Sequence, residues 1–382
     1  MRFKLLTTVL TFFVFALFAN MNVFSQQYDE SYIKENLPEL LGANNVGTEF
    51  WISNPPCFED ESYGHDNFVQ LFVSSPVETE VKLEIPGKGY FERKTTRPNN
   101  VIVFNIDPTI GQPVTKSGRQ NPPEEKVYRG EAIHLYADDP IIVYCMVRYR
   151  ATSDGYLAIP VSAMGKEYIV AAYNEDPMFR AVWSYKLPST SVIVAPFDNT
   201  KVRFTMGGNG FSRTAGGLTP GQSTQTTLNK GDAWMFMSDY DNADLTGSRI
   251  VANKPIGVIS GNQCTNIPIG NQWCDYTVEM QLPTMVWGRD YHVGKIPNRK
   301  FPPIIRVFAK EPDTRIYRDN RQVGFIPQVG GIQGKAFQEL RLHPREMDNH
   351  SVVISGDKPI GVTLYNTGVQ EDGYPRPNTD PF

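Results

Sequence analysis

The sequence predicts an all-β protein made of three tandem β-sandwich-like repeats of about 95–120 residues each. Two observations lead to this fold class. Short apolar runs alternate with polar residues between turns rich in Gly and Pro, and a period of two marks half-buried strands. The same strand motifs also recur three times along the 382 residues, as expected for duplicated units. One ordinary domain core holds about 100–150 residues, so the chain has room for three units.

The N-terminal segment has the features of a secretory signal. Arg2 and Lys4 give a positive start, and an apolar run follows over residues 5–18. This pattern predicts a signal peptide over residues 1–25 and a leader over residues 26–46. The alternative is a membrane anchor, which needs about 20 apolar residues in a row, more than this run supplies. No later segment is apolar enough to be a membrane-spanning helix.

The first repeated motif is a strand with the pattern Gly-x-acid-aromatic. It opens the three predicted units, 47–164, 165–287 and 288–382, as Gly47-Thr48-Glu49-Phe50, Gly165-Lys166-Glu167-Tyr168 and Gly288-Arg289-Asp290-Tyr291. A later strand begins at a proline, in Asp139-Pro140-Ile141, Lys254-Pro255-Ile256 and Lys358-Pro359-Ile360. We expect this proline at the first position of the strand, where its missing N–H is harmless.

The last repeated motif is an acid followed by tyrosine. It occurs as Asp154-Gly155-Tyr156, Asp275-Tyr276 and Asp372-Gly373-Tyr374. Three active sites in tandem are rare, so we expect a structural role for these acids, as acceptors for turn amides beside the tyrosine. The first two units continue past this motif into a further strand, whereas the third copy stops early. Two interpretations follow: a longer product, or an open sheet edge that a partner uses.

The four cysteines suggest disulfides, because an even count is typical of exported chains. Cys264 and Cys274 are the best pair, since the loop between them is short and rich in Pro, Gly and Asn. Closing such a loop stabilises a fold by about 2–3 kcal/mol. Pairing of Cys57 with Cys145 follows only by elimination. A metal site is the rival interpretation, but the chain has no C-x-x-C motif.

Two acidic loops are candidates for calcium, which binds six to eight oxygens. One contains Glu59-Asp60-Glu61 and Asp66, and the other contains Asp239, Asp241, Asn242 and Asp244. A solvated turn is the plainer interpretation of each loop. The same carboxylates are also candidates for the acid pair of a glycosidase. No other cofactor is expected, and no motif for a catalytic nucleophile or a metal-binding His pair is present.

Aromatic side chains in polar loops are the best candidates for ligand binding. Trp273 lies inside the loop between Cys264 and Cys274, and a tryptophan on a braced loop loses little entropy on binding. Sugar rings or a protein groove are suitable partners. The alternative is that Trp273 caps the local core. Trp183 and Tyr63 are weaker candidates in other polar loops.

Several of these motifs together resemble a known family. They are Gly47-Thr48-Glu49-Phe50, Ser260-Gly261-Asn262-Gln263-Cys264 and Cys274-Asp275-Tyr276-Thr277-Val278-Glu279, extended by Leu282-Pro283 and Trp287 to Tyr291. Over residues 47–382 the chain resembles the N-terminal domain family of immunoglobulin-G-Fc-binding protein. The resemblance implies an extracellular binding or adhesion module rather than an enzyme, and it supports the Cys264–Cys274 pair. It supplies no ligand-binding residues.

We therefore expect a secreted or cell-surface protein of the outer envelope that recognises a protein or glycan ligand through loops of its β-sandwich repeats, without catalysis. Two alternatives are a carbohydrate-active enzyme that uses loop carboxylates and a structural subunit of a larger cell-surface assembly. The net charge of −4 and the lack of a basic stripe argue against nucleic acid as a partner.

Overall fold

The computed structural model describes residues 45–59, 67–115, 125–150, 152–271, 273–347, 351–368 and 370–373. These residues belong to the compact unit that begins at Ala43. The predicted signal peptide, most of the leader, Tyr63, the acids at 60, 61 and 66, and Tyr374 lie outside them. In the part of the chain that is described, no helix has the length and apolar character that crossing a membrane requires.

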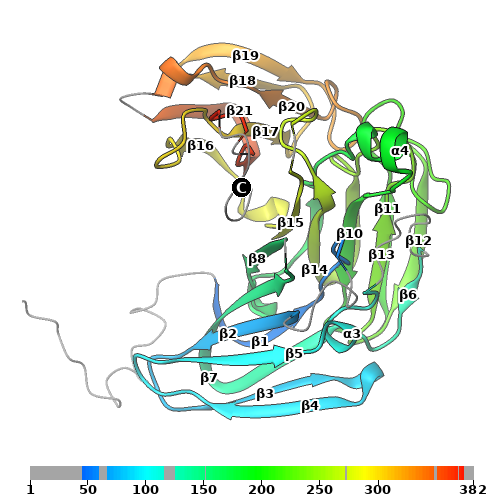
Figure 1. Cartoon of the computed structure of the whole chain (residues 1–382), viewed down its shortest axis with the longest axis vertical. Coiled ribbons are helices and arrows are strands. Elements are labelled where there is room, and N and C mark those ends of the chain that lie inside the picture. The colour runs from blue at the N-terminus through cyan, green and yellow to red at the C-terminus, as the bar shows by residue number, and fades with distance from the viewer. Residues whose placement is uncertain are drawn as a thin grey trace, which may run out of the picture. The chain divides into compact units, whose positions relative to one another are not determined.

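The first unit is a sheet of seven strands among the described residues (Figure 1). Its elements are β1 (Val46–Ile52), β2 (Phe68–Ser74), β3 (Glu80–Ile85), η2 (Pro86–Lys88), β4 (Tyr90–Thr95), β5 (Val101–Ile106), α3 (Pro108–Gly111), β7 (Ile133–Arg148) and β8 (Ser153–Leu157). The strand order is β4-β3-β7-β2-β5, and β1 and β8 also pair with β7.

The second and third units repeat this order, which confirms the predicted all-β, three-repeat fold. The first unit ends with η3 (Val161–Ala163). The second contains β9 (Gly165–Ile169), α4 (Pro177–Trp183), β10 (Ser189–Val194), β11 (Thr200–Thr205), β12 (Ser223–Leu228), β13 (Ala233–Met237), β14 (Arg249–Thr265), β15 (Asp275–Met280) and η4 (Thr284–Val286). The third contains β16 (Gly288–Val293), β17 (Ile304–Ala309), β18 (Thr314–Arg318), β19 (Arg321–Ile326), β20 (Phe337–Leu340), η5 (Pro344–Met347) and β21 (Val352–Tyr365). Their orders are β12-β11-β14-β10-β13 and β19-β18-β21-β17-β20.

One long strand in each unit belongs to both layers of the sandwich: β7, β14 and β21. The first half of β14 pairs with β9 and β11, and the second half pairs with β10 and β15. The repeated proline, Pro255 in this unit, lies between the halves, where the register of β9 shifts between Val251 and Ile256. The same shift occurs at Pro140 and Pro359. The expectation that this proline starts a strand is therefore wrong: the strand is continuous and bends where a missing N–H breaks no ladder bond.

The Gly-x-acid-aromatic motif forms the strand that crosses this bend. The Tyr168 hydroxyl accepts a hydrogen bond from Gly165 N at 2.9 Å and donates one to Ile256 O at 2.6 Å. Tyr291 makes the same two bonds in the third unit, at 3.0 and 2.8 Å. Phe50 occupies the position in the first unit and has no hydroxyl. In the second and third units, the tyrosine hydroxyl therefore satisfies one backbone N–H and one backbone C=O that the bend leaves unpaired.

The first and second units share one hydrophobic core. Its members from the second unit, such as Val192, Met235 and Tyr276, pack with the buried faces of β1, β2 and β7. A short strand, β6 (Val127–Tyr128), also leaves the first unit and pairs with β13 of the second. The units are therefore neighbours that bury apolar surface against each other, rather than beads separated by linkers.

The second and third units meet around Arg306 of β17, which is 2% exposed. Its guanidinium donates to Asp244 Oδ2 at 3.0 Å, Thr246 Oγ1 at 2.8 Å and Ala172 O at 2.7 Å, and it lies 4.3 Å from the ring centre of Tyr173. Burial works against the charged guanidinium, but Asp244 outweighs it and holds the pKa of Arg306 above its usual value. A buried charge is tolerated only when it is paired and hydrogen-bonded in this way.

Candidate functional site

The predicted disulfide between Cys264 and Cys274 is present and joins the end of β14 to the start of β15. The suggested pair of Cys57 and Cys145 is wrong, because both thiols are free and buried. Cys57 Sγ lies 2.9 Å from Thr152 Oγ1, whereas Cys145 Sγ donates to Asn54 Oδ1 at 3.2 Å. Burial raises the pKa of each thiol to about 12, which keeps both protonated and unreactive.

One of the predicted aromatic residues, Trp183, contacts the cluster that packs against this disulfide, and another, Trp273, directly precedes Cys274 in the chain. Phe179 of α4 is buried in a cluster with Leu187 and Cys264, and its ring centre is 5.5 Å from that of Trp183. The Trp183 side chain is 49% exposed, and Trp273, next to Cys274, is 44% exposed. Both tryptophans thus present part of their surface to solvent. We call Trp183, Trp273 and the exposed Val182 the aromatic surface.

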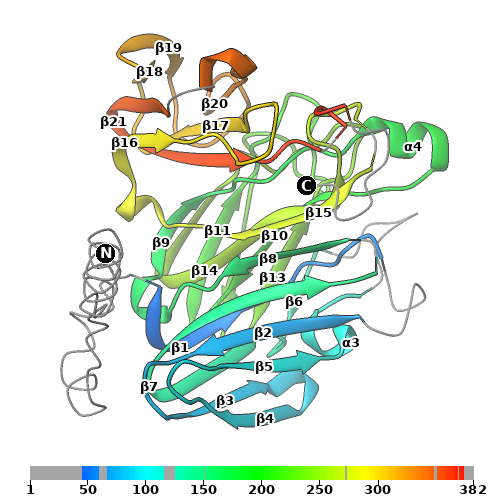
Figure 2. The ribbon, with the colours of Figure 1, turned by 60° about the vertical axis from the view of Figure 1, so that its left-hand side comes forward.

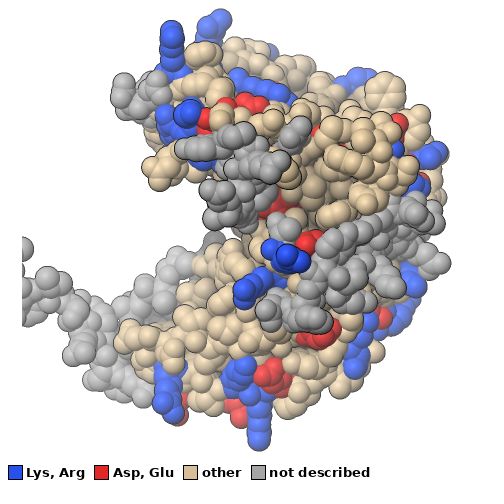
Figure 3. Space-filling model, in the orientation of Figure 1, with Lys and Arg blue, Asp and Glu red and all other residues tan. Residues whose placement is uncertain are grey.

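The position of α4 is fixed by a buried carboxylate. Glu175 accepts from Arg180 Nε at 2.9 Å and from Arg180 Nη2 at 2.8 Å, and it also accepts from Leu187 N at 2.8 Å. The Asp176 side chain caps the N-terminus of α4 by accepting from Met178 N. These bonds hold the helix and Trp183 in place. Figure 3 shows the surface around α4, at upper right, as mostly uncharged, which suits contacts with apolar or aromatic faces of a ligand.

The expected calcium site at Asp239, Asp241 and Asp244 does not form. Asp244 faces Arg306 at the junction of the second and third units, whereas Asp239 accepts from Arg180 at 3.1 Å. Asp241 lies at the edge, with its carboxylate 3.7 Å from Arg180 Nε. Because cations already hold these acids apart, they do not converge on one metal. Across the described residues, no group of three His, Cys, Asp or Glu side chains is arranged to hold a metal ion.

The repeated acids accept hydrogen bonds from backbone amides. Asp154 accepts from Gly155 N and Val278 N, both at 2.8 Å, and so connects β8 to β15. Asp275 accepts from Tyr276 N at 2.8 Å. Asp372 instead accepts from backbone amides of another loop and from a guanidinium. These donors are Lys300 N, Phe301 N and Arg299 Nε.

The strand pairing shows that Asp154 and Asp275 are not equivalent positions. Ala158 N donates to Val143 O, and Gln281 N donates to the equivalent Val258 O. Ala158 and Gln281 therefore correspond. Tyr156, two residues before Ala158, then corresponds to Glu279 and not to Tyr276. The two acid-tyrosine motifs are thus similar in sequence but occupy different positions in the two units.

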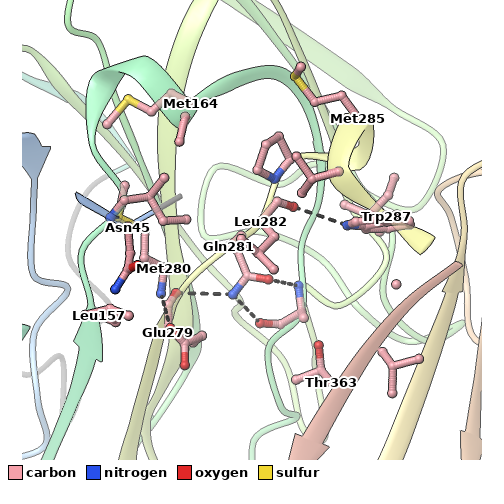
Figure 4. A pocket seen from close by; sticks show the side chains of 18 of the residues that line it. Asn45, Leu157, Met164, Glu279, Met280, Gln281, Leu282, Met285, Trp287 and Thr363 are labelled. Carbon is pink, nitrogen blue, oxygen red and sulfur yellow. Dashed lines mark hydrogen bonds between the residues drawn. The ribbon is translucent and has the colours of Figure 1, made fainter. Parts of the chain in front are cut away.

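An apolar groove of about 840 Å³ lies between β15, η4 and β21. Figure 4 shows Met164, Met285 and Trp287 around it, with Gln281 bonded to backbone groups at its wall. Trp287 Nε1 donates to Leu282 O at 3.3 Å, which holds its ring along the groove. A groove of this size and character is typical of binding sites.

A second cavity of about 350 Å³ adjoins the groove and contains carboxylates from two units, Asp154, Asp275 and Glu279. Figures 1 and 2 both show β8 beside β15, which brings these acids together. Desolvation raises the pKa of Glu279 to about 7, against a hydrogen bond from Met280 N, and Asp154 adds repulsion. Glu279 is therefore the carboxyl group in this cavity that changes charge near neutral pH.

Sequence reasoning missed Glu279 and Arg306 as site residues. Glu279 belongs to one of the motifs recognised in the sequence, but no local pattern indicates that Asp154 of another unit lies near it. Arg306 lies in the strand run Ile304 to Ala309, and a charged residue within an otherwise apolar strand is a usable signal of a buried ion pair.

Repeated β-sandwich units that carry an aromatic surface and an apolar groove define an all-β repeat protein with surfaces suited to recognition. The chain belongs to the IgGFc binding protein family, whose model matches residues 154–382. It is 24% identical to human IgGFc-binding protein over 307 residues, which is 79% of this chain and 5% of that protein. The chain thus spans about one-twentieth of the length of this curated relative. No solved structure matches the chain.

Proposed function

We propose that this protein is an extracellular recognition protein that binds a protein or glycan through the aromatic surface and does not catalyse a reaction. The observation that carries the proposal is the exposure of Trp183 and Trp273, at 49% and 44%, around a disulfide. Large exposed aromatic side chains on a rigid support are typical anchors for ligands.

Export of the chain supports the same function. The signal-like N-terminal segment and the Cys264–Cys274 disulfide both suit an oxidising compartment outside the cytoplasm. The human relative is named for binding of IgG Fc, so Fc is the first protein ligand to test. Family membership favours binding over the enzyme alternative.

The test is a screen of the mature protein on glycan arrays and protein arrays that include Fc. We expect at least one saturable ligand whose affinity falls tenfold or more in Trp273→Ala and Trp183→Ala. A matched control is Trp234→Ala, because this tryptophan is buried in the core of the second unit. That change lowers stability without removing a surface anchor. Unaltered binding by both surface variants would exclude the aromatic surface as the site.

A second candidate function, glycoside hydrolysis, is favoured by one observation: Asp154 and Glu279 line one cavity, and Glu279 has the raised pKa of a general acid. Against it, Asp154 is held by two backbone amides as a link between strands. Hydrolysis of any glycan identified by the array, lost in Glu279→Gln, would support this candidate. Binding without turnover supports the recognition function.

A further inference from the structure

The first two units are closed by segments with one shared pattern, apolar-x-apolar-Pro. The segments are Leu157-Ala158-Ile159-Pro160 and Met280-Gln281-Leu282-Pro283. In each, the second residue donates its N–H to the long strand: Ala158 N to Val143 O at 2.9 Å, and Gln281 N to Val258 O at 2.8 Å. The closing segment therefore completes one layer of each sandwich.

The equivalent edge of the third unit is at Val362 and Leu364 of β21. Val143, Val258 and Val362 are equivalent positions of β7, β14 and β21. Each lies opposite the equivalent residue of the neighbouring strand, which is β2, β10 or β17. Backbone groups of a central strand alternate between its two neighbours, so Val362 and Leu364 direct N–H and C=O away from β17. Among the described residues, no strand pairs with this edge.

The opening glycines show a second difference between the units. A Cβ on Gly47 would lie 2.4 Å from Pro160 Cβ, and a Cβ on Gly165 would lie 2.4 Å from Pro283 Cβ. The closing proline of each unit thus sits directly on that unit's first glycine. At Gly288 the nearest atom would be 3.9 Å away. Among the described residues, no atom fills the corresponding place in the third unit.

The apolar groove described above runs along this open edge. Gly361, Val362, Thr363 and Leu364 of β21 form one wall, and η4 and Trp287 contribute apolar side chains. Exposed apolar residues surround it: Leu282 at 60%, Met285 at 67%, Val286 at 46% and Leu364 at 44%. Apolar surface concentrated beside an unpaired strand edge is a feature of sites that accept an added strand.

We infer that the third unit binds an extended segment of a partner polypeptide with the pattern apolar-x-apolar-Pro. Its second residue donates an N–H to Val362 O, its apolar side chains enter the groove, and its proline covers Gly288. The two closing segments within this chain are the templates for this occupant. Residues 374–382 do not contain the pattern, and we propose a separate polypeptide as the source of the segment. This site is separate from the aromatic surface.

The test uses a labelled synthetic peptide with the sequence of residues 276–286, which contains the pattern Met280-Gln281-Leu282-Pro283. We expect saturable one-to-one binding to the full mature chain in fluorescence anisotropy. Binding should weaken at least tenfold in Gly288→Ala, which fills the proline position with a methyl group. This variant should fold at least as well as the wild type, because alanine is favoured over glycine within a strand. Gly294→Ala, also in open space, is the matched control and should bind normally.

A second variant tests the edge itself. Leu364→Pro removes an N–H that points away from β17, and proline is tolerated at such positions of edge strands. This variant should also abolish peptide binding. Retained binding in Trp273→Ala would confirm that the two sites are independent. Failure of the wild type to bind the peptide, or equal binding by Gly288→Ala, overturns the inference. Peptide binding that emerges only after deletion of residues 374–382 would assign the site to the chain's own end and also overturn it.

Discussion

At the scale of single residues, the surroundings of two buried ionisable groups affect their charged forms in opposite directions. Arg306 enters the second unit from the third and finds a carboxylate, a hydroxyl and a carbonyl within 3.0 Å. Glu279 lies in a cavity with Asp154 and finds mainly desolvation and a like charge. The first group fixes the junction of two units, whereas the second makes the molecule sensitive to pH.

The Arg306 junction predicts a large loss of stability in Arg306→Met. The variant keeps an unbranched apolar stem but leaves Asp244 buried without its cation, which costs about 3–5 kcal/mol. Arg315→Met is the control, because the Arg315 side chain is 55% exposed in its ion pair with Asp357. Such a surface pair contributes about 0–1 kcal/mol. Urea denaturation of both variants measures the difference, and equal losses would contradict a buried junction.

Glu279 predicts a pH dependence with a defined sign. Its pKa is about 7 in the folded chain and 4.5 as the ordinary value, so the folded state holds the proton more tightly. The stabilising effect of protonation is complete below about pH 4.5 and is lost as the pH rises to about 7. Glu279→Gln stays neutral, so above pH 7 it should unfold at a higher urea concentration than the wild type. The gap should close near pH 4, and a constant gap across this range would contradict the assignment.

At the scale of elements, the long bent strand organises each unit. Its first half belongs to one layer and its second half to the other, and the repeated proline marks the bend. A strand that changes layers leaves backbone groups unpaired at the bend. The tyrosine of the opening strand satisfies two of them with one hydroxyl.

Tyr168→Phe tests this role of the hydroxyl. The change leaves Gly165 N and Ile256 O without their partner in a buried site, at a cost of about 1–3 kcal/mol. Phe50→Tyr is the reciprocal variant, because it introduces a hydroxyl where the first unit lacks one. Thermal unfolding should show a loss in Tyr168→Phe. An unchanged melting temperature would mean that the hydroxyl contributes nothing to the bend.

At the scale of the whole molecule, the sequence was sufficient for the fold class and insufficient for the sites. Local patterns such as Gly165-Lys166-Glu167-Tyr168 revealed strands and repeats, because strand periodicity and turn chemistry are encoded within a few residues. The Cys264–Cys274 pair was also predictable, since its loop is short. The sequence around Pro255 predicts a strand start instead of a bend, because a sequence does not show that strands on both sides continue as one.

Features that depend on contacts between residues far apart in the chain were beyond the sequence. Cys57 and Cys145 lie far apart in the chain and find Thr152 and Asn54 instead of each other. The acidic loop at Asp244 has the composition of a calcium site, but Arg306 of the next unit forms an ion pair with Asp244. The groove along β21 is likewise formed by segments of all three units. Each depends on long-range packing that no local pattern encodes.

The central claim is that one building block occurs three times, closed in the first two copies and open in the third. Hydrogen–deuterium exchange at equivalent amides tests it most directly. Cys145 and Ser260 lie opposite Tyr156 and Glu279 in paired strands, whereas Leu364 is their equivalent on the unpaired edge. We predict slow exchange at Cys145 and Ser260, fast exchange at Leu364, and slowing of Leu364 when the 276–286 peptide is added. Equal protection of all three amides in the free protein would contradict the claim.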